Sequence, residues 1–357
     1  MRIEGINLDV RKYFVSLDTT VREAIKAIDN LGKKTVFVVG ENDELKGIFT
    51  DGDMRRFILA NGDLNAPVKE AMNPNPKVFY EHEDIKGKKS NDKKMMVYPI
   101  INNKGQVVRA IFWDNDEFIS SSNEINDNIP VVIMAGGKGT RLYPYTKILP
   151  KPLIPIGEVP IVQHIINRFT KYNCKEFHLV INHKKNMIKS YFGDIDKNYD
   201  LSYVEESEFL GTGGGLSLLK GKINSTFFFS NCDILIDANY GDLYKYHKEK
   251  KNKITLVCAL KHVTIPYGVI NIDNEGAIKD MTEKPEISFL TNTGLYIIEP
   301  EVLDSIEENK FIHMPEIVQQ YIDRNENVGV YPLSENQWLD MGQIDEMNNM
   351  IKVLEDK

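Results

Sequence analysis

Short apolar runs recur along the chain from residue 130 onward, separated by segments with helical periodicity. The runs VVIM, FHLVI, TFFFS and ITLVCA are rich in β-branched and aromatic residues, which favours strands at residues 131–134, 177–181, 226–230 and 254–259. Apolar residues at helical spacing predict helices over 161–169 and 187–192. Strands that alternate with helices predict an α/β fold, with a doubly wound, mixed but mostly parallel sheet between helices.

A different pattern occupies the first 120 residues. The predicted order is helix, strand, strand, helix, at residues 20–31, 35–39, 45–49 and 51–59. A weaker copy of the two strands follows at 97–101 and 107–112, after an insert at 81–94 that is too polar for the expected apolar helix. This repetition predicts an α+β pair packed as one module over 1–120. The Ser- and Asn-rich stretch before Pro130 predicts a linker at 121–129 and a second domain over 130–357.

Composition narrows the class of protein. A chain of 357 residues is too long for one core, in agreement with two domains. The formal net charge of −8 argues against a surface for nucleic acid. The chain begins without an apolar leader segment and has no stretch of membrane-spanning length, so we expect no membrane association. Its three cysteines cannot all pair and lack metal-site spacing, which favours a reducing, cytoplasmic location.

The most informative stretch is VVIMAGGKGTRLYPYTKILPKPLIP, at residues 131–155. A strand that leads into a glycine-rich loop forms an anion site, because backbone amides approach phosphate where no Cβ intervenes. The loop is not a P-loop, since Gly139 is followed by Thr140 and Arg141 rather than by Lys and Ser or Thr. It also lacks the third glycine of the dinucleotide fingerprint, because Leu142 occupies that position.

Residue for residue, this stretch resembles the signature of the sugar-phosphate nucleotidyltransferases, GGxGTRLxPxTxxxPKPLxPI. The resemblance implies a Rossmann-like catalytic domain that transfers a nucleotidyl group from a nucleoside triphosphate to a sugar 1-phosphate. It also implies catalytic roles for Arg141 and Lys151. The nucleotide-binding residues that it implies in the loop are Ala135, Gly136, Gly137, Gly139 and Thr140.

A second motif, EESEFLGTGGGL, concerns the base. In the family, the residue five positions before the LGT glycine reads the base edge, and here Glu206 precedes Gly211 by five. Uracil and thymine suit a glutamine amide, whereas the two adjacent donors of guanine suit a bidentate carboxylate. Guanylyltransferases of the family have Glu there, so we expect GTP, with Gly211 and Thr212 also at the nucleotide. Thymidylyl-, uridylyl- and cytidylyltransferases are the alternatives.

The resemblance also implies a metal and a sugar site. Asp233, after the strand FFFSN, and Asp340, in WLDMG, match the family's Mg²⁺ ligands, and carboxylate oxygens suit this hard cation. The motifs YG, EKP and NTG match its sugar-binding positions. The implied sugar-phosphate-binding residues are Gly268, Glu283, Lys284 and Asn292.

The N-terminal repeats resemble a tandem pair of cystathionine-β-synthase (CBS) domains. In such pairs a Thr and an Asp of the motif GxxTxxD contact the ribose of an adenosine ligand such as AMP or ATP, and Thr50 and Asp53 match them. In the second copy Trp113 and Asp116 stand at these positions, so the hydroxyl is lost. A pair kept only for packing is equally compatible with the sequence. Paired CBS modules also imply a homodimer.

The sugar stays open at this stage. CBS-fused members of the family occur in bacterial surface-glycan pathways, including nonulosonic acid routes of the legionaminic type that begin from glucosamine 1-phosphate. Mannose 1-phosphate and heptose 1-phosphate are the alternatives. A regulatory adenosine-nucleotide sensor without turnover is the alternative outside the enzymes, but such a sensor would be free to lose Arg141, Lys151, Asp233 and Asp340.

Overall fold

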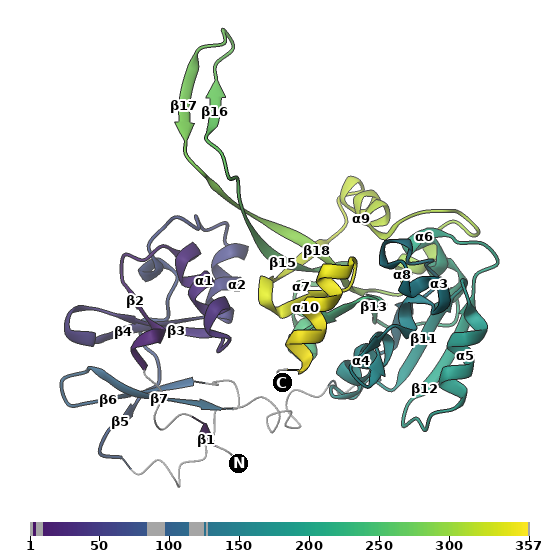
Figure 1. Ribbon diagram of the computed structural model, residues 1–357, viewed down its shortest axis with the longest axis horizontal. Coiled ribbons are helices and arrows are strands. Elements are labelled where there is room, and N and C mark those ends of the chain that lie inside the picture. The colour runs from purple at the N-terminus through teal and green to yellow at the C-terminus, as the bar shows by residue number, and fades with distance from the viewer. Residues whose placement is uncertain (1–2, 5–9, 84–96, 114–124, 126–127, 356–357) are drawn as a thin grey trace.

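The computed structural model of the chain describes residues 3–4, 10–83, 97–113, 125 and 128–355. Figure 1 shows an N-terminal part and a larger C-terminal part side by side, with one long hairpin projecting from the C-terminal part. The N-terminal elements are β1 (Ile3–Glu4), β2 (Phe14–Ser16), α1 (Val21–Leu31), β3 (Thr35–Val39), β4 (Leu45–Thr50), α2 (Asp51–Leu59), β5 (Phe79–Tyr80), β6 (Val97–Ile101) and β7 (Val107–Trp113).

The C-terminal part begins with β8. Its helices are α3 (Tyr145–Ile148), α4 (Ile161–Thr170), α5 (Lys185–Gly193), α6 (Gly211–Gly214), α7 (Tyr240–Lys250), α8 (Glu301–Ser305), α9 (Met314–Asp323) and α10 (Ile344–Glu355). Its strands are β8 (Val131–Met134), β9 (Pro155–Ile156), β10 (Val159–Pro160), β11 (Glu176–Ile181), β12 (Asp200–Glu205), β13 (Phe227–Asn231), β14 (Ile234–Ile236), β15 (Ile254–Thr264), β16 (Val269–Ile272), β17 (Ile278–Thr282), β18 (Glu286–Ile298), β19 (Val328–Ser334) and β20 (Trp338–Asp340).

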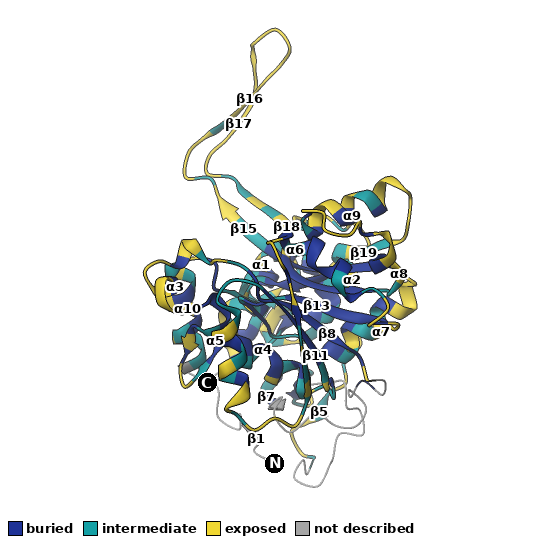
Figure 2. Cartoon of the chain, turned by 90° about the vertical axis from the view of Figure 1, so that its right-hand side faces the viewer, coloured by how far each residue is buried: buried dark blue, intermediate teal, exposed yellow. Residues whose placement is uncertain are grey.

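A seven-stranded sheet forms the core of the C-terminal part, in the order β12-β11-β8-β13-β18-β15-β19. Four of its six strand pairs are parallel and the two that involve β18 are antiparallel. Its inner strands are buried, as Figure 2 shows. Along β8, Val131 and Ile133 face one apolar cluster and Val132 and Met134 face the other, so helices cover both faces. The predicted α/β fold with a mixed, mostly parallel sheet is confirmed.

The N-terminal part contains two small sheets, β2-β3-β4 and β1-β7-β6-β5. Both have the same pattern, in which an antiparallel hairpin is joined on one side by a parallel strand. Phe37 and Ile48 of the first sheet pack against Val97 and Val107 of the second. Most of the insert at 81–94, most of the linker at 121–129, and Asp116 lie outside the described residues.

Helix α2 of the N-terminal part lies on β19, the last strand of the large sheet. Arg55 Nε donates a hydrogen bond to the Pro332 carbonyl oxygen (3.3 Å), and its guanidinium lies 4.0 Å from the centre of the Tyr331 ring. Leu260 of β15 belongs to the apolar core around α1 and α2. The N-terminal part therefore covers the β19 edge of the sheet, whose other edge strand is β12.

Two buried carboxylates lie at this contact. Both oxygens of Asp51 lack a hydrogen-bond partner among the described residues, although Lys34 and Arg55 are close enough to act on its charge. Burial raises the pKa of Asp51 to about 6, and burial likewise raises the pKa of Asp29 to about 6. The interface thus holds acidic groups that favour the protonated form more than ordinary aspartates do.

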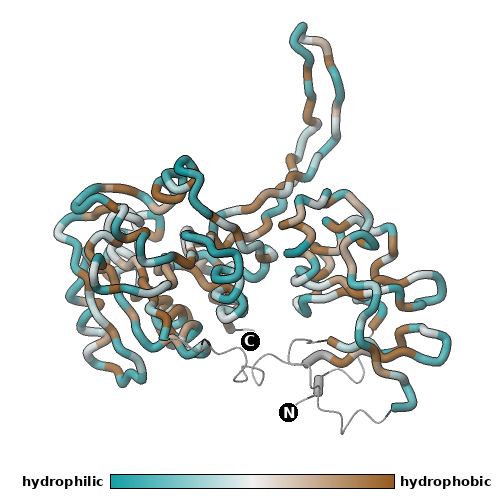
Figure 3. Tube along the Cα trace, turned by 180° about the vertical axis from the view of Figure 1, so that it is seen from behind, coloured by the Kyte–Doolittle hydropathy of each residue, from teal (hydrophilic) through white to brown (hydrophobic). Residues whose placement is uncertain are grey.

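The hairpin β16–β17 extends from the upper ends of β15 and β18, away from the rest of the chain (Figures 1 and 2). Every residue of β17 is exposed, and so are the apolar side chains of Ile270, Ile272, Ile278 and Met281. Figure 3 shows brown and teal positions alternating along this hairpin. In the described part of the chain, we find no helix that combines the length and the apolar character needed to cross a membrane.

Candidate active site

The glycine-rich loop follows β8 at the carboxyl end of the sheet's parallel strands. Ala135 and Gly136 are buried, whereas Gly137 and Thr140 are progressively more exposed. Gly139 has a left-handed backbone (φ +64°), which favours glycine. A Cβ at this position would lie only 3.1 Å from Lys151 Cβ, so glycine lets the loop pack closely against Lys151. The fold thus brings the glycine-rich loop next to Lys151, and anion binding by this loop stays a prediction.

Glu206 occupies a closed position directly beneath this loop. Glu206 follows β12, and its side chain is buried between Gly136 and Gly215. A Cβ added to Gly136 would lie 2.6 Å from Glu206 Oε2, and a Cβ added to Gly215 would lie 2.8 Å from Glu206 Oε1. One carboxylate oxygen accepts a long hydrogen bond from the Leu210 amide (3.4 Å) and the other has no partner among the described residues. Burial raises the pKa of Glu206 to about 7. A buried acceptor without a donor is suited to a ligand that supplies N–H groups.

Lys151, which is buried, and the half-buried Asp233 and Asp340 form a charged group at the ends of β13 and β20. Lys151 Nζ donates a hydrogen bond to the Asp233 carboxylate. The Met341 amide donates to the Asp233 carbonyl oxygen (2.8 Å), and β14 pairs with β20, so the two aspartates lie together although 107 positions separate them. Burial lowers the pKa of Lys151, but Asp233 and Asp340 outweigh it and the net shift is upward.

Asp233 and Asp340 supply carboxylate oxygens that a divalent cation prefers, although no cluster of three or more His, Cys, Asp or Glu side chains within the described residues could hold an ion by itself. Burial raises the pKa of Asp340 to about 6, and the charges of Asp233 and Glu346 add to the effect. Glu346, on α10, is a third acidic residue near Asp340. Both side chains lie against Gly342, because a Cβ added there would lie 3.2 Å from Glu346 Oε2 and 3.2 Å from Asp340 Oδ2. One lysine among several carboxylates leaves excess negative charge, which a hard cation would neutralise. Asp233 and Asp340 are therefore the residues that would hold such an ion.

The segment after Glu206 packs its glycines against the loop before α9. Gly211 has φ +82°, and a Cβ there would lie 2.5 Å from the Ile312 carbonyl oxygen. That oxygen accepts hydrogen bonds from the amides of Gly213 (2.9 Å) and Gly214 (3.0 Å). The Thr212 hydroxyl accepts from the Met314 amide (3.1 Å), which caps α9. Within the chain, Gly211 and Thr212 thus fix the wall beside Glu206, and their nucleotide contacts stay a prediction.

The predicted sugar-binding residues are divided between two places. Asn292 is on β18 and lies near the site. Gly294, two positions further along β18, packs against the side chain of Asn231, which precedes Asp233 by two positions. Gly268, Glu283 and Lys284 instead lie at the base of the projecting β16–β17 hairpin, and Glu283 and Lys284 are exposed. The Lys284 amide donates a hydrogen bond to the Tyr267 carbonyl oxygen (3.3 Å), so these motifs contact each other. The fold does not place them against the glycine-rich loop.

Other residues near the loop were missed by sequence reasoning. Lys184 Nζ donates hydrogen bonds to the carbonyl oxygens of Thr146 (2.9 Å), Lys147 (2.7 Å) and Ile148 (2.9 Å), which fixes α3 of the signature stretch. Asn182 Nδ2 donates to the Glu206 carbonyl oxygen (3.3 Å). Such contacts join loops far apart in sequence, so no local pattern marks them. Arg141 is exposed in the turn after the loop, and its contact with a triphosphate stays a prediction.

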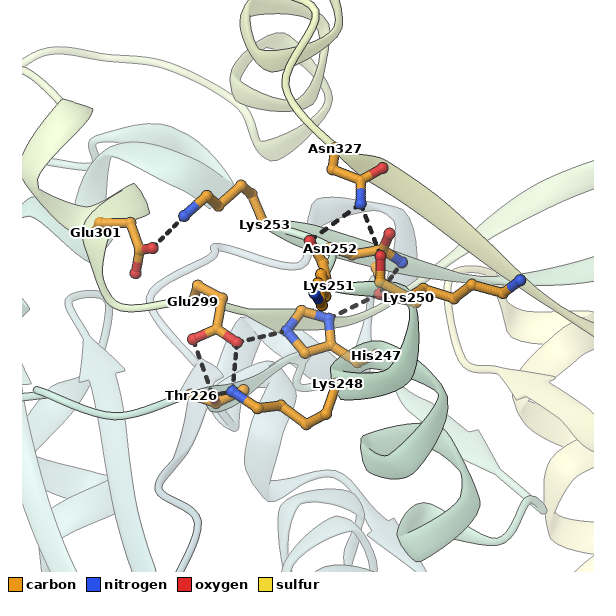
Figure 4. Close-up of polar contacts among 11 residues, drawn as sticks. Thr226, His247, Lys248, Lys250, Lys251, Asn252, Lys253, Glu299, Glu301 and Asn327 are labelled. Carbon is orange, nitrogen blue, oxygen red and sulfur yellow. Dashed lines mark hydrogen bonds and ion pairs between the residues drawn. The ribbon is translucent and has the colours of Figure 1, made fainter.

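At the opposite end of the sheet, a second polar cluster surrounds His247 (Figure 4). Glu299 accepts hydrogen bonds from Lys248 Nζ (2.7 Å) and the Thr226 hydroxyl (2.9 Å), and its other contact is His247 Nε2 (3.2 Å). His247, which is fully buried, is hydrogen-bonded through Nδ1 to Thr255 Oγ1 (2.7 Å). Burial raises the pKa of Glu299, but its hydrogen bonds outweigh burial and lower it to about 2.

In the N-terminal part, Thr50 and Asp53 form the cap of α2. The Thr50 hydroxyl donates to Asp53 Oδ2 (2.6 Å) and accepts from the Asp53 amide (3.3 Å), while Asp53 also pairs with Arg56. This is a capping box, which satisfies amides at the helix start. The two residues therefore already have a structural role, and an adenosine ligand on them stays a prediction.

Comparison with known proteins finds one family for the C-terminal part of the chain and another for the first repeat of the N-terminal part. A family model described as nucleotidyl transferase matches residues 130–357, and a CBS domain model matches residues 9–60. The mannose-1-phosphate guanylyltransferase catalytic subunit beta of Drosophila pseudoobscura pseudoobscura is 30% identical over 232 residues, or 63% of this chain and 62% of that protein. The bifunctional protein GlmU of Methanococcus aeolicus is 31% identical over 221 residues, or 59% of this chain and 51% of that protein.

The chain thus spans between about half and three fifths of these curated relatives. Among solved structures, HddC from Yersinia pseudotuberculosis matches with a TM-score of 0.50 at 21% identity, covering 63% of this chain and 99% of that one. At this level of identity the likeness is one of fold.

Proposed function

Because the chain belongs to the nucleotidyl transferase family and contains a CBS domain, we propose that it transfers GMP from GTP to a sugar 1-phosphate. The observation that carries the choice of GTP is Glu206, a buried carboxylate beside Gly136 with one oxygen free of hydrogen bonds among the described residues. Guanine presents two adjacent N–H donors, from N1 and the 2-amino group, which would satisfy both oxygens. Relatives named mannose-1-phosphate guanylyltransferase support the same base.

In the proposed reaction, an oxygen of the sugar 1-phosphate attacks the α-phosphorus of GTP. A new P–O bond forms, the bond from the α-phosphorus to the bridging oxygen of the β-phosphate breaks, and its electron pair leaves with pyrophosphate. No general base is needed, because the attacking phosphate is already ionised at neutral pH. Lys151 and Arg141, with the amides of the glycine-rich loop, would position the phosphates and offset their charge.

The finer parts of the proposal concern the ion and the setting. Asp233 and Asp340 would hold Mg²⁺, which supplies charge neutralisation at the phosphates. AMP or ATP would bind the CBS module, and the chain would act as a homodimer in the cytoplasm. The sugar would be glucosamine 1-phosphate, for a surface-glycan or legionaminic-acid-type route, or mannose 1-phosphate, which the names of the relatives favour.

The test is pyrophosphate release with Mg²⁺, crossing four nucleoside triphosphates with a panel of sugar 1-phosphates. We expect release with GTP and one sugar, and a Glu206→Gln variant that prefers UTP or dTTP over GTP relative to the parent. Release from the parent with UTP or dTTP alone would contradict the role of Glu206 while leaving the reaction class intact. Failure with every pair, with and without AMP or ATP, would contradict the enzyme itself.

A further inference from the structure

A cavity lies between the N-terminal part and the transferase part, away from the candidate active site. Its volume is about 480 Å³, which is within the usual range for small-molecule sites. One wall is α2, and the other is α7 with the edge strand β19. Its lining includes Arg55 and Leu59 from α2, Lys245, Tyr246 and Lys250 from α7, and Tyr331 from β19. Both parts of the chain are therefore needed to form it.

The charges around the cavity favour an anion. Its lining includes four cationic side chains and two carboxylates, although the whole chain has a net charge of −8. Lys245 is paired with Glu249 (3.6 Å) and Arg56 with Asp53. Neither Arg55 nor Lys250 is paired with a carboxylate within the described ranges 10–83, 97–113 and 128–355. Figure 4 shows the Lys250 side chain extending away from the His247 cluster. One such cation thus comes from each part of the chain.

The other lining groups favour an organic portion beside the charge. The rings of Tyr246 and Tyr331 meet edge to face, with centroids 5.2 Å apart, and the Tyr246 hydroxyl donates to the Val330 carbonyl oxygen (2.9 Å). Leu59 adds an apolar side chain on the facing helix, and it is exposed in spite of its size. Arg55 is held over the Tyr331 ring, so its planar guanidinium is oriented before any ligand arrives.

From this arrangement we propose that the cavity is a second binding site, for a small phosphorylated organic molecule. Its phosphate is bound by Arg55 and Lys250, and its organic portion packs on Tyr246 and Leu59. Because the two cations belong to different parts of the chain, the ligand strengthens the contact between α2 and α7 as it binds. The site uses none of the residues of the candidate active site and does not depend on the proposed reaction.

The experiment titrates the full chain with phenyl phosphate, by calorimetry and by thermal unfolding. We expect saturable binding and a rise in the unfolding temperature with ligand, with a dissociation constant in the range of about 0.1 to 5 mM. The variant Lys250→Glu should weaken the affinity about tenfold or more, because a repulsive charge replaces the phosphate partner. Its matched control is Lys251→Glu, which makes the same charge change on the next residue but does not line the cavity.

Two further variants locate the probe. Arg55→Lys should weaken binding while it keeps the charge at the interface, since lysine cannot replace the guanidinium fork. Lys151→Ala should leave the affinity for phenyl phosphate within about twofold, because Lys151 does not line the cavity. Equal affinities for the parent and Lys250→Glu would overturn the proposal. It would also be overturned by loss of binding in Lys151→Ala, or by an equal loss in Lys251→Glu.

Discussion

The seven-stranded sheet buries carboxylates at both of its ends, but it surrounds them differently. At one end Glu299 is hydrogen-bonded to Lys248, Thr226 and His247, and its pKa falls to about 2. At the other end Glu206 has a single long hydrogen bond, and its pKa rises to about 7. A carboxylate with all its hydrogen bonds made stabilises the fold. A buried carboxylate with few hydrogen bonds lowers stability and marks a candidate ligand site. The comparison therefore separates a structural end of the sheet from the end that carries the proposed active site.

Breaking the end that carries the proposed active site should give the largest effect. In Lys151→Ala, and separately in Asp233→Ala, we expect kcat/KM for pyrophosphate release to fall about 10²- to 10³-fold or more, as when a single charged group is removed from a phosphoryl or oxyanion site. Circular dichroism should show a folded chain in both. Lys248→Ala, at the other end of the sheet, is the control and should keep kcat. Near-normal turnover in either active-site variant would contradict the assignment.

Breaking the structural end should reduce stability and leave chemistry intact. Glu299→Ala leaves the fully buried His247 and the Thr226 hydroxyl without their acceptor, so we expect a loss of about 2 to 4 kcal/mol in the free energy of unfolding. The measurement is urea unfolding of the parent and the variant at pH 7.5. The exposed Glu307–Lys310 pair is the control, since Glu307→Ala removes a partner from Lys310 alone and should leave the midpoint of urea unfolding unchanged. A Glu299 variant as stable as the parent would contradict the comparison.

The interface between the two parts gives a third test, this time on a carboxylate that lowers stability. The pKa of Asp51 is raised to about 6, so its contribution to stability is fully present below its ordinary pKa near 4 and is lost as the pH rises through 6. Asp51→Asn should therefore stabilise the chain by about 2 kcal/mol at pH 8 and by much less at pH 4. Asp53→Asn, which disturbs the α2 cap instead, should not stabilise it. The opposite pH trend would show that Asp51 is partnered.

The smallest expected effect is the pH dependence of base binding. Glu206 must be ionised to accept two N–H donors, and its pKa of about 7 lies within the physiological range. The affinity for GTP should therefore rise about tenfold between pH 6 and pH 8. UTP serves as the control, because it has the same triphosphate but does not need the carboxylate. In Glu206→Gln the affinities for GTP and UTP should depend on pH to the same extent. If the stronger pH dependence for GTP persisted, a group other than Glu206 would be responsible for it.

Much of the catalytic end could be predicted from the sequence, because a long motif fixes both residue types and spacing. Val131 to Met134 form an inner strand of the sheet, as predicted, and Glu206 lies beside Gly136 of the glycine-rich loop, while its base-reading role stays a prediction. Asp233 and Asp340 also meet, although no local periodicity indicates that β14 pairs with β20. For Asp233 and Asp340, the family's motif pattern predicted a contact between distant parts of the chain that local periodicity does not indicate.

The remainder depends on contacts that the local pattern does not encode. Lys184 anchors α3 and Glu346 approaches Asp340 through loops and helices that meet only in three dimensions. The placement of Glu283 and Lys284 at the base of a projecting hairpin follows from the length of β15 and β18, which continue beyond the sheet. The packing of α2 on β19 was likewise outside what either repeat could indicate.

That last contact has a consequence for solubility. A sheet's final strand exposes amide and carbonyl groups that can pair with another chain, and proteins usually protect such strands. Here α2 lies on β19, and Arg55 is bonded to the carbonyl of Pro332. A transferase part produced alone from residue 130 would expose this strand with Leu260, and should aggregate more readily than the full chain. By this argument the N-terminal module also protects the β19 edge from pairing with other chains, with or without a bound ligand.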